Sequence, residues 1–342
     1  MHEIDLKKWK IHTDLVFDDI LDDDLKEKVF YKTREFGKNV VVEEVKISKD
    51  LEEVIQKRAG RYKMISFDDI SDRDNFNLVL KAFSSEFSLL LEEIGFNNKM
   101  KVLVVGLGNC KSTPDAVGPK VLENVLVTSH LFSLGSVEDG YCDVSIFEPN
   151  VSGETGIDTK DLICALNDRL KPDLIIFIDA LATSAIDRVN KSIQISDSGI
   201  NPGSGVSNAR GVLDKDLLGC KVVVIGIPTV MDSATIVFDT INYMFKKFSY
   251  QKKEKTAREK LMSSDNYINC PDNLSREEKK ELFGIVGTLD SYSMKQLIFE
   301  VLSPIKYNFM VTTKEIDFFV DRISLLIGKG INMSLHDKKD LI

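Results

Sequence analysis

Two aspartates stand where strongly apolar segments of the chain end. Asp115 follows the run 102–105 after a glycine-containing turn, and Asp179 follows the run 174–178 directly. If both runs are neighbouring parallel strands, their carboxyl ends meet at one sheet edge, which is where open α/β sheets bind ligands. Two carboxylates close together do not both ionise easily, so one can hold a proton while the other activates water. The pattern predicts metal-free acid/base hydrolysis by this pair, although the sequence alone leaves open that Asp115 only caps the next helix.

The elements that must position this pair alternate between strands and helices. A third apolar run covers 222–225, and amphipathic helical patterns cover 117–126, 159–170 and 233–245. Short β-branched runs bounded by Gly, Pro or Asp are typical of buried parallel strands, with the helices as crossovers between them. The alternation predicts an α/β fold with a mostly parallel sheet covered by helices.

The glycine turn after the first strand does not complete a nucleotide-binding motif. Gly106 and Gly108 fit the start of G-x-G-x-x-G, but Lys111 occupies the place of the third glycine. This departure disfavours a non-enzymatic, Rossmann-like binding module, which is one alternative function. The stretch 196–211 is rich in small residues that let a backbone approach an extended peptide or an oxyanion. No G-x-S-x-G motif accompanies it, so a serine nucleophile is disfavoured.

Composition and charge exclude several function classes. The chain has 342 residues, with 45 Lys+Arg against 54 Asp+Glu and a formal net charge of -9, so its overall field does not attract a nucleic acid or an anionic membrane. No apolar run approaches the roughly 20 residues that span a bilayer, and the charged N-terminus lacks a signal-peptide pattern. We therefore expect a cytoplasmic protein without direct nucleic acid or membrane partners. Five scattered cysteines and four histidines predict no disulfide, no metal site and no cofactor.

The predicted core, about 75–245, is preceded by a charge-dense region. A helical pattern ending at Gly95 opens the core. The first seventy residues carry one short strand pattern, at 40–47, and are predicted to form a peripheral arm. After the core, the stretch 246–274 is basic and then polar, which predicts a solvated surface excursion.

The last part of the chain, about 275–336, is predicted to be helical. Capping-box patterns begin at Ser275 and Thr312. The apolar helix after the second pattern is predicted to stop at Gly328 or Gly330.

An ordered set of short motifs resembles the germination protease family of spore-forming bacteria, endopeptidases that degrade small acid-soluble spore proteins. It runs from Gly-Leu-Gly-Asn to Gly-Ile-Asn-Met-Ser-Leu-His, and the matching segments are 106–109, 113–119, 155–157, 178–182, 188–200, 202–206, 226–232, 313–317 and 330–336. Each motif is weak alone, but together they cover nearly the whole chain and are highly specific. The sequence departs from the family pattern in three places: Asn201 stands where histidine is expected, Ser207 stands where glycine is usual, and the stretch 151–154 is only loosely similar to the family's loop before Thr155.

The resemblance implies a three-layer α/β fold similar to that of hydrogenase-maturation endopeptidases. It implies an aspartate-dependent endopeptidase with Asp115 and Asp179 as the catalytic carboxylates. It also implies a zymogen that removes a propeptide, residues 1–14, by autocatalytic cleavage after Asp14, which leaves a single protease domain, 15–342. Homotetramer assembly, small acid-soluble spore proteins as substrates, and a location in the cytoplasm of the forespore and spore core follow from the same resemblance.

The expected cleavage site, Asp14–Leu15, places an acidic residue before an apolar one. Binding that acidic side chain in a protein of charge -9 requires a local cation, and arginine grips a carboxylate with two parallel hydrogen bonds. The residues predicted to bind the substrate are Arg188, Arg210, Gly203, Ser204 and Gly205. One enzymatic alternative stays open, a metal-dependent endopeptidase of the hydrogenase-maturation type. Such an enzyme needs a metal held by carboxylates and usually a histidine, and His130 is the only histidine in the predicted core that could bind it, so this alternative ranks below the aspartate mechanism.

Overall fold

The chain forms two compact units in the computed structural model. The larger consists of Thr13–Thr183, Asp187–Val230 and Thr312–Ile342, and the smaller of Met1–His12, Ser184–Ile186 and Met231–Val311. The structure describes residues 13–20, 23–135, 137–202, 211–252, 267, 270–302 and 309–337. Within these residues, no helix is long and apolar enough to cross a membrane.

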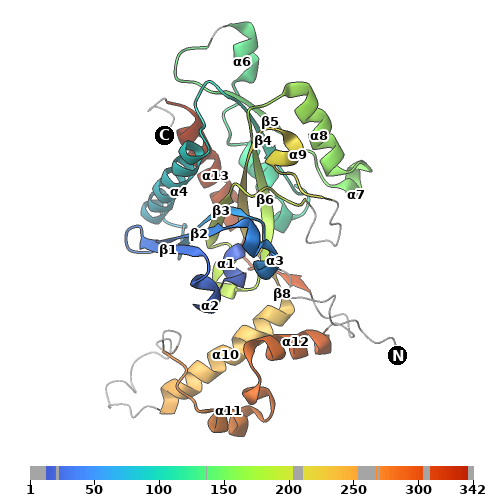
Figure 1. Ribbon diagram of the computed structural model, residues 1–342. Helices are drawn as coiled ribbons and strands as arrows, with labels where there is room; N and C mark the ends of the chain where they lie inside the picture. The colour runs from blue at the N-terminus through green and yellow to red at the C-terminus, as the bar shows by residue number, and fades with distance from the viewer. Residues whose placement is uncertain are drawn as a thin grey trace. The chain divides into compact units, whose positions relative to one another are not determined.

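The larger unit is built on one mixed sheet (Figure 1). Its described strands are β1 Phe30–Glu35, β2 Val40–Ile47, β3 Gly60–Phe67, β4 Lys101–Gly106, β5 Asp143–Phe147, β6 Leu174–Thr183, β7 Ser192–Ser196 and β8 Lys221–Asp232, whose end enters the smaller unit. They lie in the order β1-β2-β3-β7-β8-β6-β4-β5. β4 pairs in parallel with β5 and β6, whereas the succession from β1 through β2, β3 and β7 to β8 is antiparallel.

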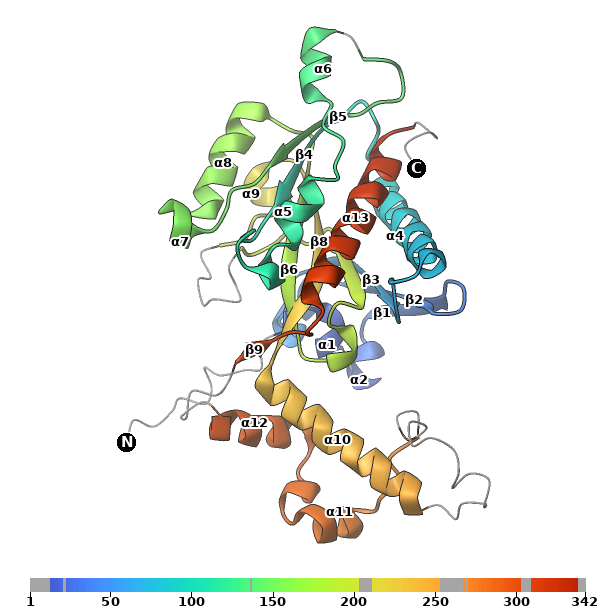
Figure 2. The same ribbon diagram turned by 180° about the vertical axis from the view of Figure 1, so that it is seen from behind.

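Helices cover both faces of this sheet. The described helices of the larger unit are α1 Val16–Asp19, α2 Asp23–Lys26, α3 Glu52–Ile55, α4 Arg73–Glu93, α5 Val117–Leu122, α6 Ser129–Leu134, α7 Ser152–Thr155, α8 Thr159–Leu170, α9 Lys215–Leu218 and α13 Ile316–Leu335, with short 3-10 turns η2 Lys49–Leu51 and η3 Thr113–Asp115. α4, α5 and α13 pack on one face, as Figure 2 shows, and α8 and α9 lie on the other. The predicted α/β fold with helices on both sides of a sheet is confirmed.

Successive residues of the central strands pack into opposite layers. Val104 and Ile176 belong to the core shared with α4, α5 and α13. Their neighbours Val105 and Ile175 belong to the core beneath α8 and α9. All four are 0% exposed. Burial on both faces explains why these strands appear in the sequence as continuous apolar runs rather than as alternating patterns.

The predicted elements of the central region are confirmed. The three apolar runs lie inside β4, β6 and β8, and the helix predicted to end at Gly95 is α4. Gly95 has φ +74°, which is the left-handed conformation of a helix C-terminus. α8 has its predicted bounds because the Asp158 side chain accepts a hydrogen bond from the Lys160 N–H at its N-terminus. α5 is shorter than predicted and ends at Leu122.

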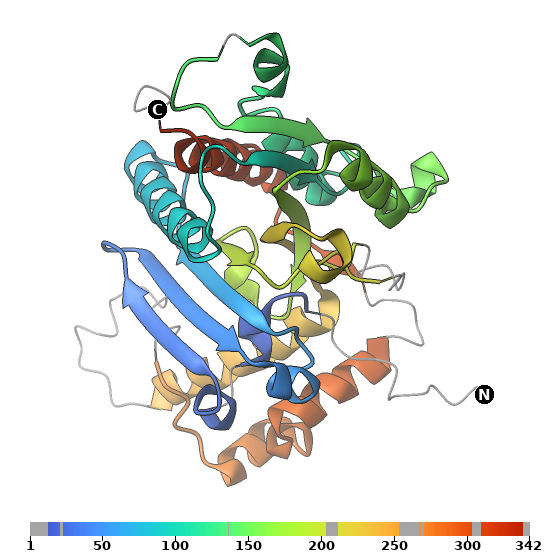
Figure 3. The same ribbon diagram turned by 45° about the horizontal axis from the view of Figure 1, so that its top comes forward.

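The prediction of a peripheral arm in the first seventy residues is wrong, because β1, β2 and β3 are strands of the sheet. They appear as three adjacent blue arrows in Figure 3, and β3 pairs with β7. In β2, Val40, Val42 and Val45 are buried, while the residues between them are more exposed. Val40 and Val42 belong to one core cluster, whereas Val45 belongs to another on the opposite face of the strand, so β2 shows neither a continuous apolar run nor a regular alternation in the sequence.

The prediction that α13 stops at a glycine is also wrong, since the helix continues to Leu335. A Cβ atom on Gly328 would lie 2.4 Å from the Asn124 Cβ, and one on Gly330 would lie 2.3 Å from the Phe83 Cδ1. These glycines therefore allow α13 to pack closely against its neighbours and do not end it.

The two predicted capping boxes have different outcomes. Ser275 accepts a hydrogen bond from the Glu278 N–H, and the Glu278 side chain accepts one from the Ser275 N–H, so the first box is confirmed. The second is wrong. α13 has Glu315 as its N-cap without a side-chain cap, and the Thr312 hydroxyl donates to the Thr229 carbonyl at 2.6 Å instead.

The smaller unit is helical in its described part. Its elements are α10 Ser233–Lys252, α11 Arg276–Phe283, η8 Val286–Thr288, α12 Ser291–Leu302 and β9 Met310–Val311. Phe238, Phe245 and Ile298 belong to its buried apolar core. The predicted charged excursion, 246–274, begins later than expected because α10 continues to Lys252, and its stretch 253–266 lies outside the described residues.

Candidate active site

Glycines bring the turn after β4 against the middle of β6. Gly108 has φ +115°, and a Cβ atom there would lie 2.0 Å from the Asp115 carbonyl oxygen. A Cβ atom on Gly118 would lie 2.1 Å from the Leu107 carbonyl oxygen and 2.8 Å from that of Ile178. The Leu107 N–H also donates to the Ile178 carbonyl at 2.8 Å. Only glycine fits these two positions, and the close approach carries η3 to the neighbourhood of β6.

Asp115 ends η3 and does not cap α5. The N-cap of α5 is Ala116, and no side chain caps it. Burial raises the pKa of Asp115 to about 6, against an opposing hydrogen bond from the backbone of Asn109. A carboxyl group with this pKa changes its charge close to neutral pH, as a general base or acid requires.

Asp179 lies within β6 and not at its end as predicted, because the strand continues to Thr183, although the pairing of β6 with β4 stops at Ile178. Burial raises the pKa of Asp179 well above its ordinary value, and the negative charges of Asp115 and then Asp14 raise it further. The Ala180 N–H donates to Asp179 Oδ1 at 2.9 Å and acts in the opposite direction. The structure therefore brings the two predicted carboxyl groups, both partly buried, close enough for the charge of Asp115 to act on Asp179.

This arrangement can hold one proton between two carboxyl groups. Since the charge of Asp115 disfavours ionisation of Asp179, the protonated member is Asp179 at a pH where Asp115 is ionised. A water molecule beside such a pair can lose a proton to one carboxylate, while the other carboxyl group donates a proton to a leaving group.

Asp14, the residue before the expected cleavage site, lies near enough to Asp179 for its charge to raise the pKa of Asp179. Its N–H donates to the Ala182 carbonyl at 3.0 Å, and its Oδ2 accepts from the Ala182 N–H at 2.8 Å. Ala182 is three residues after Asp179 on β6. The sequence does not indicate a role for Ala182, because it binds Asp14 through backbone groups, which every residue type except proline carries alike.

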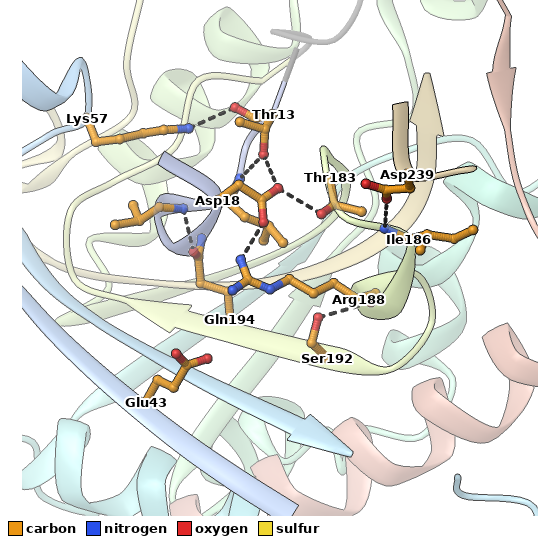
Figure 4. A network of polar contacts seen from close by, with 12 residues as sticks. Thr13, Asp18, Glu43, Lys57, Thr183, Ile186, Arg188, Ser192, Gln194 and Asp239 are labelled. Carbon is orange, nitrogen blue, oxygen red and sulfur yellow. Dashed lines mark hydrogen bonds and ion pairs between the residues drawn. The ribbon is translucent and has the colours of Figure 1, made fainter. Parts of the chain in front are cut away.

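Of the residues predicted to bind substrate, only Arg188 is described, and its ion pair joins Nη1 to Oδ1 of Asp18 (Figure 4). Gly203, Ser204, Gly205 and Arg210 lie outside the described residues, as does Ser207. Their roles stay predictions.

A cluster of polar side chains that the sequence does not predict holds the turn before Asp115 in place. Glu154 on α7 accepts hydrogen bonds from Asn109 at 3.3 Å, from Lys111 at 3.0 Å and from Asn150 at 3.0 Å. Asn109 and Lys111 flank the exposed Cys110. No local motif links α7 to this turn, so only the fold reveals the cluster.

A family profile and two relatives of similar length identify the same family. The profile of the family described as germination protease matches residues 17–341. The chain is 41% identical to a germination protease of Bacillus cereus strain B4264, over 98% of this chain and 96% of that protein. It is 42% identical to one of Bacillus subtilis strain 168, over 90% and 86% respectively. A hydrogenase maturation protease, HycI from Thermococcus kodakarensis, is 24% identical over 42% of this chain and 81% of that chain, with a TM-score of 0.28. The family profile and the full-length relatives show that the chain belongs to the germination protease family and is a protease of spore germination.

Proposed function

We propose that the protein is an aspartate-dependent endopeptidase that starts the degradation of small acid-soluble spore proteins in the cytoplasm of the germinating spore. The observation that carries this proposal is the pairing of Asp115 and Asp179, whose charges interact and whose pKa values burial raises. By the family resemblance, the enzyme assembles as a homotetramer and is made in the forespore.

In the proposed reaction, the Asp115 carboxylate takes a proton from water as the water oxygen bonds to the scissile carbonyl carbon. The protonated Asp179 then donates its proton to the amide nitrogen as the carbon–nitrogen bond breaks. The products are a free carboxyl group and a free amine. Asp115 is left protonated and Asp179 ionised, so proton exchange with solvent restores the starting state.

The enzyme is further proposed to be a zymogen that removes residues 1–14 by cutting its own Asp14–Leu15 bond. This proposal is supported by the hydrogen bonds between Asp14 and Ala182, and by the effect of the Asp14 charge on Asp179. In the uncut chain, the residue before the expected cleavage site is therefore close enough to Asp179 for its charge to raise the pKa of that carboxyl group.

The test is to purify Asp115→Asn and Asp179→Asn variants and to incubate each with a small acid-soluble spore protein, mapping the fragments by mass spectrometry. Removing a general acid or base typically lowers a rate by a factor of about 100 to 10,000. Asp168→Asn, at an exposed position of α8, is the matched control and is expected to cleave normally. Normal cleavage by either folded active-site variant would refute the assignment.

Dialysis against EDTA separates this mechanism from the metal-dependent alternative. The aspartate mechanism predicts an unchanged rate. A rate that is lost on dialysis and restored by zinc would support a metal-dependent endopeptidase instead.

A further inference from the structure

The segment that follows the expected cleavage site is bound deep in the larger unit. Leu15 is 0% exposed, Val16 1% and Phe17 2%. They pack in a cluster with Met64 of β3 and Leu181 of β6. A chain end held only by these apolar contacts could slide by a residue, since apolar contacts have little directionality.

Asp18 adds a directional contact to this segment. Its side chain is 0% exposed and forms an ion pair with Arg188, whose side chain is 15% exposed. Asp18 Oδ2 also accepts hydrogen bonds from the hydroxyl groups of Thr13, at 2.6 Å, and Thr183, at 2.8 Å. Figure 4 shows these three side chains surrounding the carboxylate. A carboxylate removed from water requires such partners, so this site specifies an acidic residue.

The contacts of Asp14 and Asp18 fix the register of the chain between them. Asp14 binds Ala182, and Asp18 binds the next residue of β6, Thr183. Between them, the Val16 N–H donates to the Gln194 side chain at 3.0 Å. On the other side, Lys57 Nζ donates to the Thr13 carbonyl at 2.8 Å. A shift of one residue would break all of these contacts together.

We propose that Arg188 is a positioning residue for self-cleavage, because its ion pair with Asp18 determines which peptide bond lies beside Asp115 and Asp179. This inference rests on the proposed self-processing. It assigns Arg188 to the acidic residue four positions after Asp14, and not to Asp14 itself. Arg188 acts through the segment and does not touch the reacting atoms.

The experiment follows self-processing of the full chain by intact-mass and N-terminal analysis. Arg188→Gln and Asp18→Asn are each expected to slow the appearance of the Leu15 terminus by about 100-fold, the effect of a misplacement near 1 Å, or to give additional termini. Because both changes remove one ion pair, the double variant is expected to be no slower than the slower single variant. Arg188→Lys keeps the charge and is expected to recover part of the rate.

Arg58→Gln is the matched control, since it breaks a more exposed arginine–aspartate pair, Arg58–Asp214, with the arginine 43% exposed. It is expected to process at the normal rate and site. Thermal unfolding of each variant checks the fold. If Arg188→Gln does not fold, Asp18→Glu replaces it, because the longer side chain keeps the charge and displaces the segment.

Two results would overturn the inference. One is normal processing at Leu15 by folded Arg188→Gln, or by Asp18→Glu in its place. The other is rate losses that multiply in the double variant, which would make the two residues independent. Failure of the proposed function looks different, because Asp179→Asn would then process itself normally.

Discussion

The pH dependence of proteolysis is the most direct test of the proposed general base. Burial raises the pKa of Asp115 to about 6 from the ordinary 3.8. As the base, Asp115 must be ionised, so the rate is expected to fall as pH drops through 6. With this pKa, about nine-tenths of the enzyme is ionised at pH 7 and about one-tenth at pH 5. The expected loss is therefore about tenfold.

The assay is kcat/KM for a short peptide with an acidic and then an apolar residue at the cleaved bond, measured from pH 4.5 to 8. This quantity reports ionisation in the free enzyme. The upper side of the profile is expected to fall where Asp179 loses its proton, since burial and the Asp115 charge both raise its pKa. A rate that stays constant from pH 7 to pH 5 in the folded enzyme would show that the base has an ordinary carboxyl pKa, and would refute the role of Asp115.

The raised pKa of Asp115 also predicts a stability effect, because the ionised group is penalised in the folded state above pH 6. Asp115→Asn should raise the urea-measured free energy of unfolding by at most about 3 kcal/mol at pH 7, and this gain should vanish near pH 4; no gain at pH 7 would contradict it. Gly108→Ala places a Cβ atom 2.0 Å from a backbone oxygen at φ +115°, so proteolysis should fall by about 100-fold, and wild-type activity would contradict the geometry. Gly330→Ala, which meets a buried phenylalanine ring at 2.3 Å, should lower the melting temperature, whereas Gly153→Ala, with nothing within 4 Å, should not; equal effects would count against the packing argument. Asp14→Lys should slow self-processing sharply, and an unchanged rate in a gel time course would show that the enzyme does not recognise the acidic side chain before the cleaved bond.

The sequence predicted those parts of the fold whose signal is local or repeated. α8 has an amphipathic period and an aspartate cap, so its bounds were predicted correctly. The central strands are buried on both faces, so they were visible as apolar runs. The proximity of Asp115 and Asp179 was expected from a topological rule for parallel strands, and Asp179 does follow the last residue of β6 that pairs with β4, although β6 itself continues to Thr183.

The features that the sequence did not reveal depend on contacts between distant segments. A glycine after an apolar helical pattern indicates a helix end, which is how Gly330 was interpreted. In α13, however, Gly330 leaves space for the ring of Phe83, about 250 positions earlier in the chain. In the same way, arginine chemistry indicated that Arg188 would bind a carboxylate, but 170 residues separate it from Asp18. Charge and residue type cannot choose among the 54 acidic residues of the chain.

The energetics of the segment 15–20 show why a single ion pair can matter there. Burying Leu15, Val16, Phe17 and Ile20 contributes about 1.5 to 3 kcal/mol for each side chain. Fixing the six backbone residues costs about 1 to 2 kcal/mol per residue. The two quantities nearly cancel, so the apolar contacts alone leave the segment only marginally bound. Its polar contacts then decide whether it stays in one register, and the pairing of Asp18 with Arg188 joins two opposite charges away from water.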